Sequence, residues 1–231
     1  VVGGGAPDGE CARDDYGGAC GCAGDAGWFG ALERGCHGRR GTALPMAAQR
    51  SGFVRGNATS FGNLSYAGQD WIGCSSSTRG IMAGSNPTGN AISYVTISST
   101  GDAQSFGTLT QVSTNRRGSC SNSTRGIWAG GASGPASINI IEYVTIASTG
   151  NSNDFGDLVT SKWSPGGVAS STRGIFAGGG NTSGGPAILS YNNSIEFITM
   201  ASQGSGTYFG DLTLGRHSPA GSCTQTRGVF A

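Results

Sequence analysis

One short phrase occurs four times in this chain. A Thr-Arg-Gly step followed by Ile or Val recurs at intervals of 46, 48 and 54 residues. A second phrase, Phe-Gly-x-Leu, recurs in step with it. A period near 50 residues is typical of repeat architectures, in which each repeat is one supersecondary unit that packs against its neighbours. The residues that mark the repeats are Arg79, Arg125, Arg173 and Arg227, with Phe61, Phe106, Phe155 and Phe209.

Each period predicts four short strands. In the third copy, residues 174–177 are an apolar run closed by glycines, and residues 194–200 alternate with period two. Residues 208–214 supply another strand, and residues 218–223 lead into the next Thr-Arg-Gly step. β-Branched and aromatic runs separated by Gly, Ser and Asn turns are typical of strands, and no useful helical period follows residue 45. The sequence therefore predicts an all-β fold.

The repeats resemble kelch repeats, which form the four-stranded blades of β-propellers. The resemblance rests on the repeat length, on the aromatic pair Tyr143 and Phe155, and on paired glycines after the second strand. These pairs are Gly130-Gly131 and Gly178-Gly179. The chain departs from kelch proteins because Phe replaces Trp and the aromatic spacing is wider. The fold class that this resemblance implies is a β-propeller of about four kelch-like blades, as a closed ring or an open arc.

Residues 61–231 resemble another group of repeats more closely. They carry phrases such as Thr-Arg-Gly-Ile-Phe-Ala-Gly-Gly, Ile-Glu-Tyr-Val-Thr-Ile and Phe-Gly-Asp-Leu. Such arrays are similar to the repeats of large structural and fibre proteins of marine tailed bacteriophages. This resemblance implies a virion protein, in a tail fibre or surface appendage, whose partners are other virion proteins within an oligomeric assembly. Location at a bacterial cell surface or secretion are the alternatives.

The repeat boundaries divide the chain into five parts. An incomplete first blade carries a Cys-rich insertion at about residues 6–45, and a terminal half blade could close a ring with it. The predicted parts are residues 1–65, 66–112, 113–161, 162–214 and 215–231. Because the chain starts without Met and stops within a repeat, we expect a mature, processed or excised piece.

The charge of the chain excludes two kinds of partner. Only 12% of the residues are charged, the formal net charge is +1, and Lys162 is the sole lysine. No basic surface is therefore expected for nucleic acid, and no polybasic stretch for a membrane surface. No apolar run approaches the ~18 residues that a membrane span needs.

Residues that recur in every copy are interpreted as scaffold. The repeated arginines could instead form a ring that binds an anion. We favour pairing with a carboxylate, such as Glu142 or Glu196, or with carbonyls within or between blades, because the guanidinium fork has five donors. Trp128 stands where the other copies have Met or Phe, so it is expected to pack in the core, as are the Phe-Gly-x-Leu phenylalanines.

The seven cysteines form two sets. One set precedes the Thr-Arg-Gly step, where the third copy has Val168, and is expected at buried apolar positions. Its members are Cys74, Cys120 and Cys223. The other set lies in the N-terminal insertion and is a candidate for disulfides or free thiols, with a metal site including His37 as the alternative. Its members are Cys11, Cys20, Cys22 and Cys36. They lack the paired Cys-x2-Cys spacing, so neither a metal nor a cofactor is predicted.

Loop geometry predicts where recognition would lie. In an up-and-down blade, the loop between strands two and three and the connection from strand four to the next blade emerge on one face. These segments vary between copies, and variable loops on a rigid scaffold often carry recognition. Aromatic rings there would stack on sugars of a host surface glycan, and cations would orient it. The candidate binding residues are Trp71, Arg116, Arg117, Lys162, Trp163, Tyr191, Arg216 and His217.

Enzyme chemistry finds little support. His37 and His217 are the only histidines, and neither lies near a nucleophile motif. The glycine runs lack the lysine and the following helix of a phosphate-binding loop. The chain is therefore predicted to be non-enzymatic. Two alternatives stay open, a purely architectural virion subunit contact and a kelch-like glycan-acting enzyme domain.

Overall fold

The computed structural model describes residues 58–68, 70–84, 89–111, 117–181 and 190–231. Every regular element in these ranges is a β-strand, which confirms the all-β prediction. Among these residues no helix has the length and apolar character that crossing a membrane requires. The insertion at residues 6–45 and its four cysteines lie outside the described ranges, as does Arg116.

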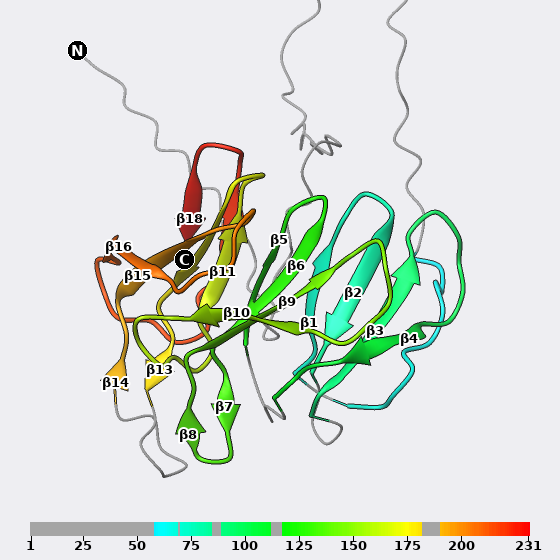
Figure 1. The fold of residues 1–231 in the computed structure, drawn as a ribbon, viewed down its shortest axis with the longest axis horizontal. Helices are drawn as coiled ribbons and strands as arrows, with labels where there is room; N and C mark the ends of the chain where they lie inside the picture. The colour runs from blue at the N-terminus through cyan, green and yellow to red at the C-terminus, as the bar shows by residue number, and fades with distance from the viewer. Residues whose placement is uncertain (1–57, 69, 85–88, 112–116, 182–189) are drawn as a thin grey trace, which may run out of the picture.

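Three four-stranded antiparallel sheets and a C-terminal hairpin lie side by side (Figure 1). Each sheet follows the simple strand order of an up-and-down unit. The first sheet contains β1 (Ile72–Ser75), β2 (Arg79–Ala83), β3 (Ala91–Thr96) and β4 (Gln104–Thr108). The second contains β5 (Gly118–Ser121), β6 (Arg125–Ala129), β9 (Ile140–Thr145) and β10 (Asn153–Asp157). The third contains β11 (Gly166–Ala169), β12 (Arg173–Ala177), β15 (Ser194–Thr199) and β16 (Thr207–Asp211), and the hairpin contains β17 (Gly221–Cys223) and β18 (Gly228–Phe230).

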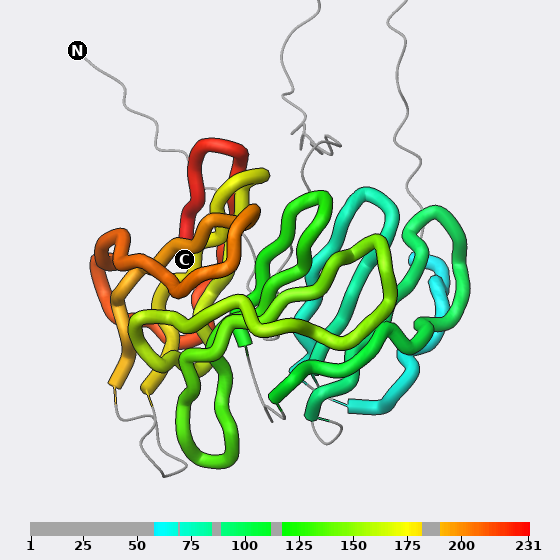
Figure 2. The backbone as a smooth tube through the Cα atoms, viewed as in Figure 1, coloured from blue at the N-terminus to red at the C-terminus, as the bar shows by residue number. Residues whose placement is uncertain are grey.

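The chain completes one sheet before it enters the next, as the continuous tube in Figure 2 shows. Each four-stranded sheet lies inside one of the three central repeats expected from the sequence. The sequence missed two short hairpins in the loops between strands two and three. They are β7 (Ala132–Ser133) with β8 (Ala136–Ser137), and β13 (Gly180–Asn181) with β14 (Ser190–Tyr191).

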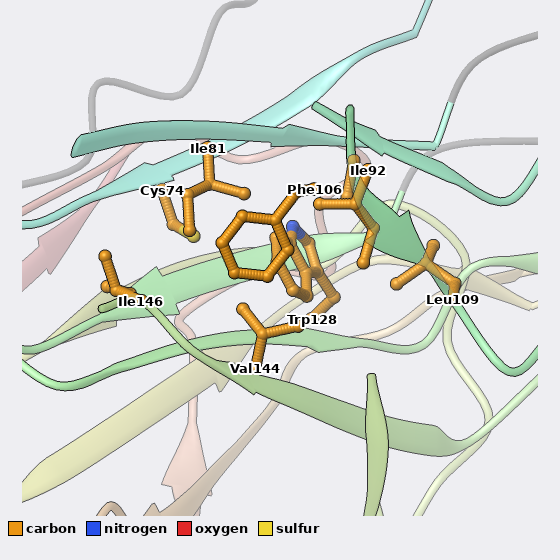
Figure 3. Packing of buried hydrophobic residues seen from close by; sticks show 9 residues of the cluster. Cys74, Ile81, Ile92, Phe106, Leu109, Trp128, Val144 and Ile146 are labelled. Carbon is orange, nitrogen blue, oxygen red and sulfur yellow. The ribbon is translucent and has the colours of Figure 1, made fainter. Parts of the chain in front are cut away.

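Neighbouring sheets bury apolar side chains between them. The first strands β1, β5, β11 and β17 contact one another in this order. Trp128 of β6 is fully buried and packs against Phe106 of the first sheet, in a cluster with Val144 of β9 and with Ile146, which follows β9 (Figure 3). The expectation that Trp128 is a packing residue is thus confirmed. A second cluster joins the next two sheets and includes Ile127, Ile141, Phe155, Leu158, Phe176, Ile198 and Met200.

A backbone link repeats at both boundaries between four-stranded sheets and explains the Phe-Gly step. The amide of Gly150 donates to the Phe106 carbonyl at 2.8 Å, and the amide of Gly204 donates to the Phe155 carbonyl at 2.8 Å. Each bond joins the fourth strand of one sheet to the turn after the third strand of the next. A Cβ at Gly107 would collide with the carbonyl of Gly150. The glycine is required because the two backbones approach so closely.

The repeated arginines also link neighbouring sheets. Arg79 Nη1 donates to the Ile146 carbonyl at 2.9 Å, and Arg125 Nη1 donates to the Met200 carbonyl at 2.6 Å. Each of these guanidinium groups lies over an aromatic ring of its own sheet, 4.7 Å from the Tyr94 centroid for Arg79. Their partners are carbonyls of the next sheet, one of the two kinds of partner expected for a scaffold residue.

Two expectations about buried repeat residues are wrong. Phe61 and Phe209 are 40% and 57% exposed, although Phe155 is 2% exposed. Cys223 is half-buried, whereas Cys74 is buried. Cys74 and Cys120 lie four residues before the Thr of the Thr-Arg-Gly step and pair with Ile81 and Ile127, whereas Cys223 lies three residues before it and pairs with Gly228. Ser222 therefore holds the position of Cys74, and Cys223 faces the other side because side chains alternate along a strand.

Candidate functional site

The two variable loop sets meet on one side of the sheets. The Gly131 amide donates to the Lys162 carbonyl at 2.8 Å, and the Gly179 amide donates to the Arg216 carbonyl at 2.7 Å. Each bond joins a loop between strands two and three to the connection that leaves the same sheet. We call this side the loop face; it comprises residues 130–139, 160–165, 178–181, 190–193 and 215–219. The β7–β8 and β13–β14 hairpins project from it, at the bottom of Figure 1.

Three aromatic side chains gather on the loop face of the third sheet. The ring centroids of Trp163 and His217 are 4.9 Å apart, and those of Tyr191 and His217 are 6.4 Å apart. Tyr191 is 60% exposed, while Trp163 and His217 are half-buried. We call these residues the aromatic cluster. They come from three separate loops, so only the fold brings them together.

Backbone hydrogen bonds hold the aromatic cluster in place. Trp163 and Gly180 exchange both amide–carbonyl bonds, at 2.7 and 2.6 Å. Tyr191 pairs with the same Gly180 across the β13–β14 hairpin. His217 follows Arg216, whose amide donates to the Asn192 carbonyl at 3.1 Å. The rings are therefore attached to a hydrogen-bonded framework, which lowers the entropy cost of ordering them on a ligand.

Two predicted binding residues are buried instead of being available to a ligand. Arg117 Nη1 lies 2.8 Å from Glu142 Oε2, and Lys162 Nζ lies 2.9 Å from Glu196 Oε1. Lys162 is fully buried and Arg117 is 6% exposed. Burial raises the pKa of the Glu142 carboxyl and lowers the pKa of Lys162, and in each pair the opposite charge opposes the shift. The assignment of Arg117 and Lys162 to a binding surface is wrong, because buried charges need internal partners.

The same carboxylates bind the connection that enters their sheet. The Val159 amide donates to Glu196 Oε2 at 2.6 Å, and the Gln111 amide donates to Glu142 Oε1 at 3.0 Å. In the first sheet this position is Ser93, whose hydroxyl lies 2.9 Å from the Ser65 hydroxyl. The third strand therefore fixes the incoming connection with either a carboxylate or a hydroxyl.

From the sequence, these glutamates were candidate partners of the repeated arginines, with backbone carbonyls as the alternative. A signal against that pairing was present in the sequence. The first copy keeps its repeated arginine, Arg79, but has Ser93 in place of the glutamate. The two copies with glutamate have a cation in the connection before the first strand, at Arg117 and Lys162. Co-occurrence of the two charges, rather than recurrence of one, identifies the ion pairs.

The other candidates lie apart from the cluster or beside it. Trp71 precedes β1 of the first sheet, is half-buried, and has an indole nitrogen buried without a hydrogen-bond partner among the described residues. Arg216 is half-buried and adjoins His217. Within the described ranges no group of His, Cys, Asp and Glu side chains could hold a metal ion. The cluster offers ring faces and hydrogen-bonding groups, which suits binding by stacking.

Neither protein-family models nor curated proteins provide a match to this chain.

Proposed function

We propose that this chain is a non-enzymatic structural and recognition module of a bacteriophage virion. It would form about four kelch-like propeller blades within a tail fibre or another surface appendage. The loop face would bind a host surface glycan. Support for the virion assignment comes from the repeat phrases, and the propeller is supported by successive up-and-down sheets that pack through their first strands.

The aromatic cluster is the observation that carries the binding proposal. Trp163 and His217 occupy equivalent positions in two successive connections, and the Tyr191 ring from the β13–β14 hairpin lies beside His217, so aromatic rings of different types meet on the loop face. Aromatic faces bind sugars by covering the C–H face of the ring, and nearby polar groups set the orientation. Ser218 Oγ lies 3.1 Å from His217 Nδ1, which orients the imidazole beside the exposed Tyr191 ring.

Binding of the purified chain to an array of bacterial surface polysaccharides tests this proposal. Tyr191→Ala and His217→Ala should each lower the apparent affinity by about tenfold, the value of one lost stacking contact. Tyr208→Ala is the matched control, because Tyr208 is 55% exposed and lies on β16 outside the loop face. It should bind like the unmodified chain.

Different outcomes would separate the alternatives. Absence of binding to any polysaccharide, or equal losses in the Tyr191 and Tyr208 variants, contradicts glycan recognition by the loop face. Cleavage or oxidation of a bound glycan would support the enzymatic alternative. Protection of Trp163 from solvent in an assembled particle, without glycan binding, would support a purely architectural contact.

A further inference from the structure

Among the described residues, none covers the C-terminal side of the third sheet as the next sheet covers the first and the second. Four apolar positions are buried at both complete sheet boundaries and at least half-open here. Phe209 is 57% exposed, and Ile175, Ile195 and Leu212 are half-buried. Their counterparts in the first and second sheets are no more than 3% exposed and comprise Phe106, Ile81, Ile92 and Leu109, with Phe155, Ile127, Ile141 and Leu158. We call the four open positions the acceptor face.

The complete boundaries show what covers such a face. In the second cluster, Phe155 packs with Phe176 of β12 and with Ile198 and Met200 at β15. Phe230 of β18 occupies the position of Phe176. No described residue occupies the positions of Ile198 and Met200, because the described hairpin β17–β18 has no third strand. A third strand with two apolar residues spaced by two is therefore the missing element.

Polar groups around the acceptor face specify the same strand. Arg216 has the backbone contacts of Lys162, since its amide donates to Asn192 and its carbonyl accepts from Gly179. Lys162 pairs with Glu196, two residues before Ile198 on the third strand. Arg216 is thus placed to pair with an acid two residues before the first apolar residue of a docked strand.

A repeated arginine supplies another contact. Arg79 and Arg125 each donate to a carbonyl just after the third strand of the next sheet. Arg173 is the next in this series; it lies 4.9 Å from the Phe197 ring centroid and is exposed. Its guanidinium is in position to donate to the corresponding carbonyl of a docked strand.

We propose that the outer edge of β18 and the acceptor face bind a β-strand of this repeat type with the pattern acid–x–apolar–x–apolar, supplied by a separate partner polypeptide. The pattern is that of Glu142-x-Val144-x-Ile146 and Glu196-x-Ile198-x-Met200. The strand pairs antiparallel with β18, inserts its two apolar side chains over Phe209, and places its acid at Arg216. The surface continues an interface already formed twice in the molecule.

A peptide that copies residues 192–214 tests this proposal on the full chain. The wild-type peptide should bind, with hydrogen-exchange protection concentrated at residues 228–230. A Glu196→Lys peptide should bind about tenfold more weakly, and so should the wild-type peptide to an Arg216→Glu chain. The Glu196→Lys peptide with the Arg216→Glu chain should recover the affinity, because the charges are exchanged.

The peptide variant keeps the test valid if the Arg216→Glu chain does not fold. The proposal would be overturned if the wild-type peptide did not bind, or if the Glu196→Lys peptide bound with the same affinity. Hydrogen-exchange protection away from residues 228–230 would overturn it as well. A peptide of the same composition in scrambled order is the control for nonspecific β-pairing, and equal binding of that peptide would overturn it as well.

Discussion

The boundary between the second and third sheets and the open side of the third sheet contain the same types of residue in different environments. Phe155 and Phe209 both follow the third strand in a Phe-Gly-Asp-Leu phrase, yet they are 2% and 57% exposed. Ile198 and Met200 of the next sheet cover the first of them. The burial of a repeat residue is therefore decided by the third strand of the following repeat.

This difference also distinguishes the interactions within a sheet from those between sheets. The strands of one sheet are joined by their own backbone hydrogen bonds. In the second and third sheets, the pairing of the third and fourth strands shifts register at the same place, next to Glu142 and next to Glu196. The stabilisation from burying apolar side chains comes from the boundary with the next sheet. An array of this kind has stability that depends on nearest-neighbour interfaces, so one substitution should have different effects in different copies.

The largest expected effect comes from removing the phenylalanine at the closed boundary. Phe155→Ala should lower the free energy of unfolding by about 3–4 kcal/mol, because it leaves a cavity in a fully packed cluster. Phe209→Ala should lower it by less than about 1 kcal/mol, since that ring is largely in water. Denaturant titration of both variants measures the two values, and equal losses would contradict the comparison.

The second effect concerns the buried ion pair. Glu196→Gln should cost about 3 kcal/mol, because it leaves the Lys162 ammonium buried without its counter-charge. Ser93→Ala, the matching change in the first sheet, should cost about 1 kcal/mol, the value of one hydrogen bond. A Ser93 variant as unstable as the Glu196 variant would show that the two positions are not equivalent.

The pH dependence of the Glu196→Gln variant follows from its lysine. Burial lowers the pKa of Lys162 below its ordinary value of 10.5. The folded chain then releases this proton more readily than the unfolded chain, so stability rises with pH until the unfolded lysine also deprotonates. The deficit of the variant relative to the unmodified chain should shrink as pH rises toward 10.5. A deficit that grows over this range contradicts a buried, unpaired lysine.

Thiol labelling should distinguish the cysteines of closed and open boundaries without changing stability. Burial raises the pKa of Cys74 to about 12 and also raises that of Cys120, so both remain protonated thiols at pH 8. Cys223 is half-buried beside the open side of the third sheet. Iodoacetamide followed by peptide mapping should modify Cys223 before Cys74 and Cys120, and rapid modification of Cys74 would show that the first boundary opens.

The smallest effect is expected on the loop face. Tyr191→Ser should change the free energy of unfolding by no more than about 0.5 kcal/mol, because the ring is mostly exposed. Thermal unfolding against the unmodified chain measures this value. A loss comparable with that of Phe155→Ala would place Tyr191 among the structural residues and remove it from the binding surface.

Much of the fold was predictable, because the repeat phrases sample the same local environment several times. The third strand 194–200 was predicted almost to its end at Thr199, since alternation and β-branched residues mark it. The predicted strand 208–214 ends earlier, at Asp211, after a register shift in its pairing with β15. Local pattern does not show where a bulge ends the pairing.

The candidate site was predictable only in part. Residue type singled out Trp163, Tyr191 and His217, whose rings lie near one another in the structure, but it gave the same status to Arg117 and Lys162. A cation in a variable connection has the same sequence signature whether it faces water or a buried carboxylate. The distinction requires knowing that Glu142 and Glu196 lie across the entering connection.

By itself the sequence determined the period, the β class and the residues that recur, because these depend on local propensity and on repetition along the chain. Only the tertiary structure decided which of those residues are buried, which cations have counter-charges and which rings meet. Burial and charge pairing depend on the neighbouring sheet, and the distance to that sheet is not encoded within any one repeat. The acceptor face of the third sheet was recognised for the same reason. Comparison with the closed boundary, where Ile198 and Met200 cover Phe155, shows that no described strand covers Phe209.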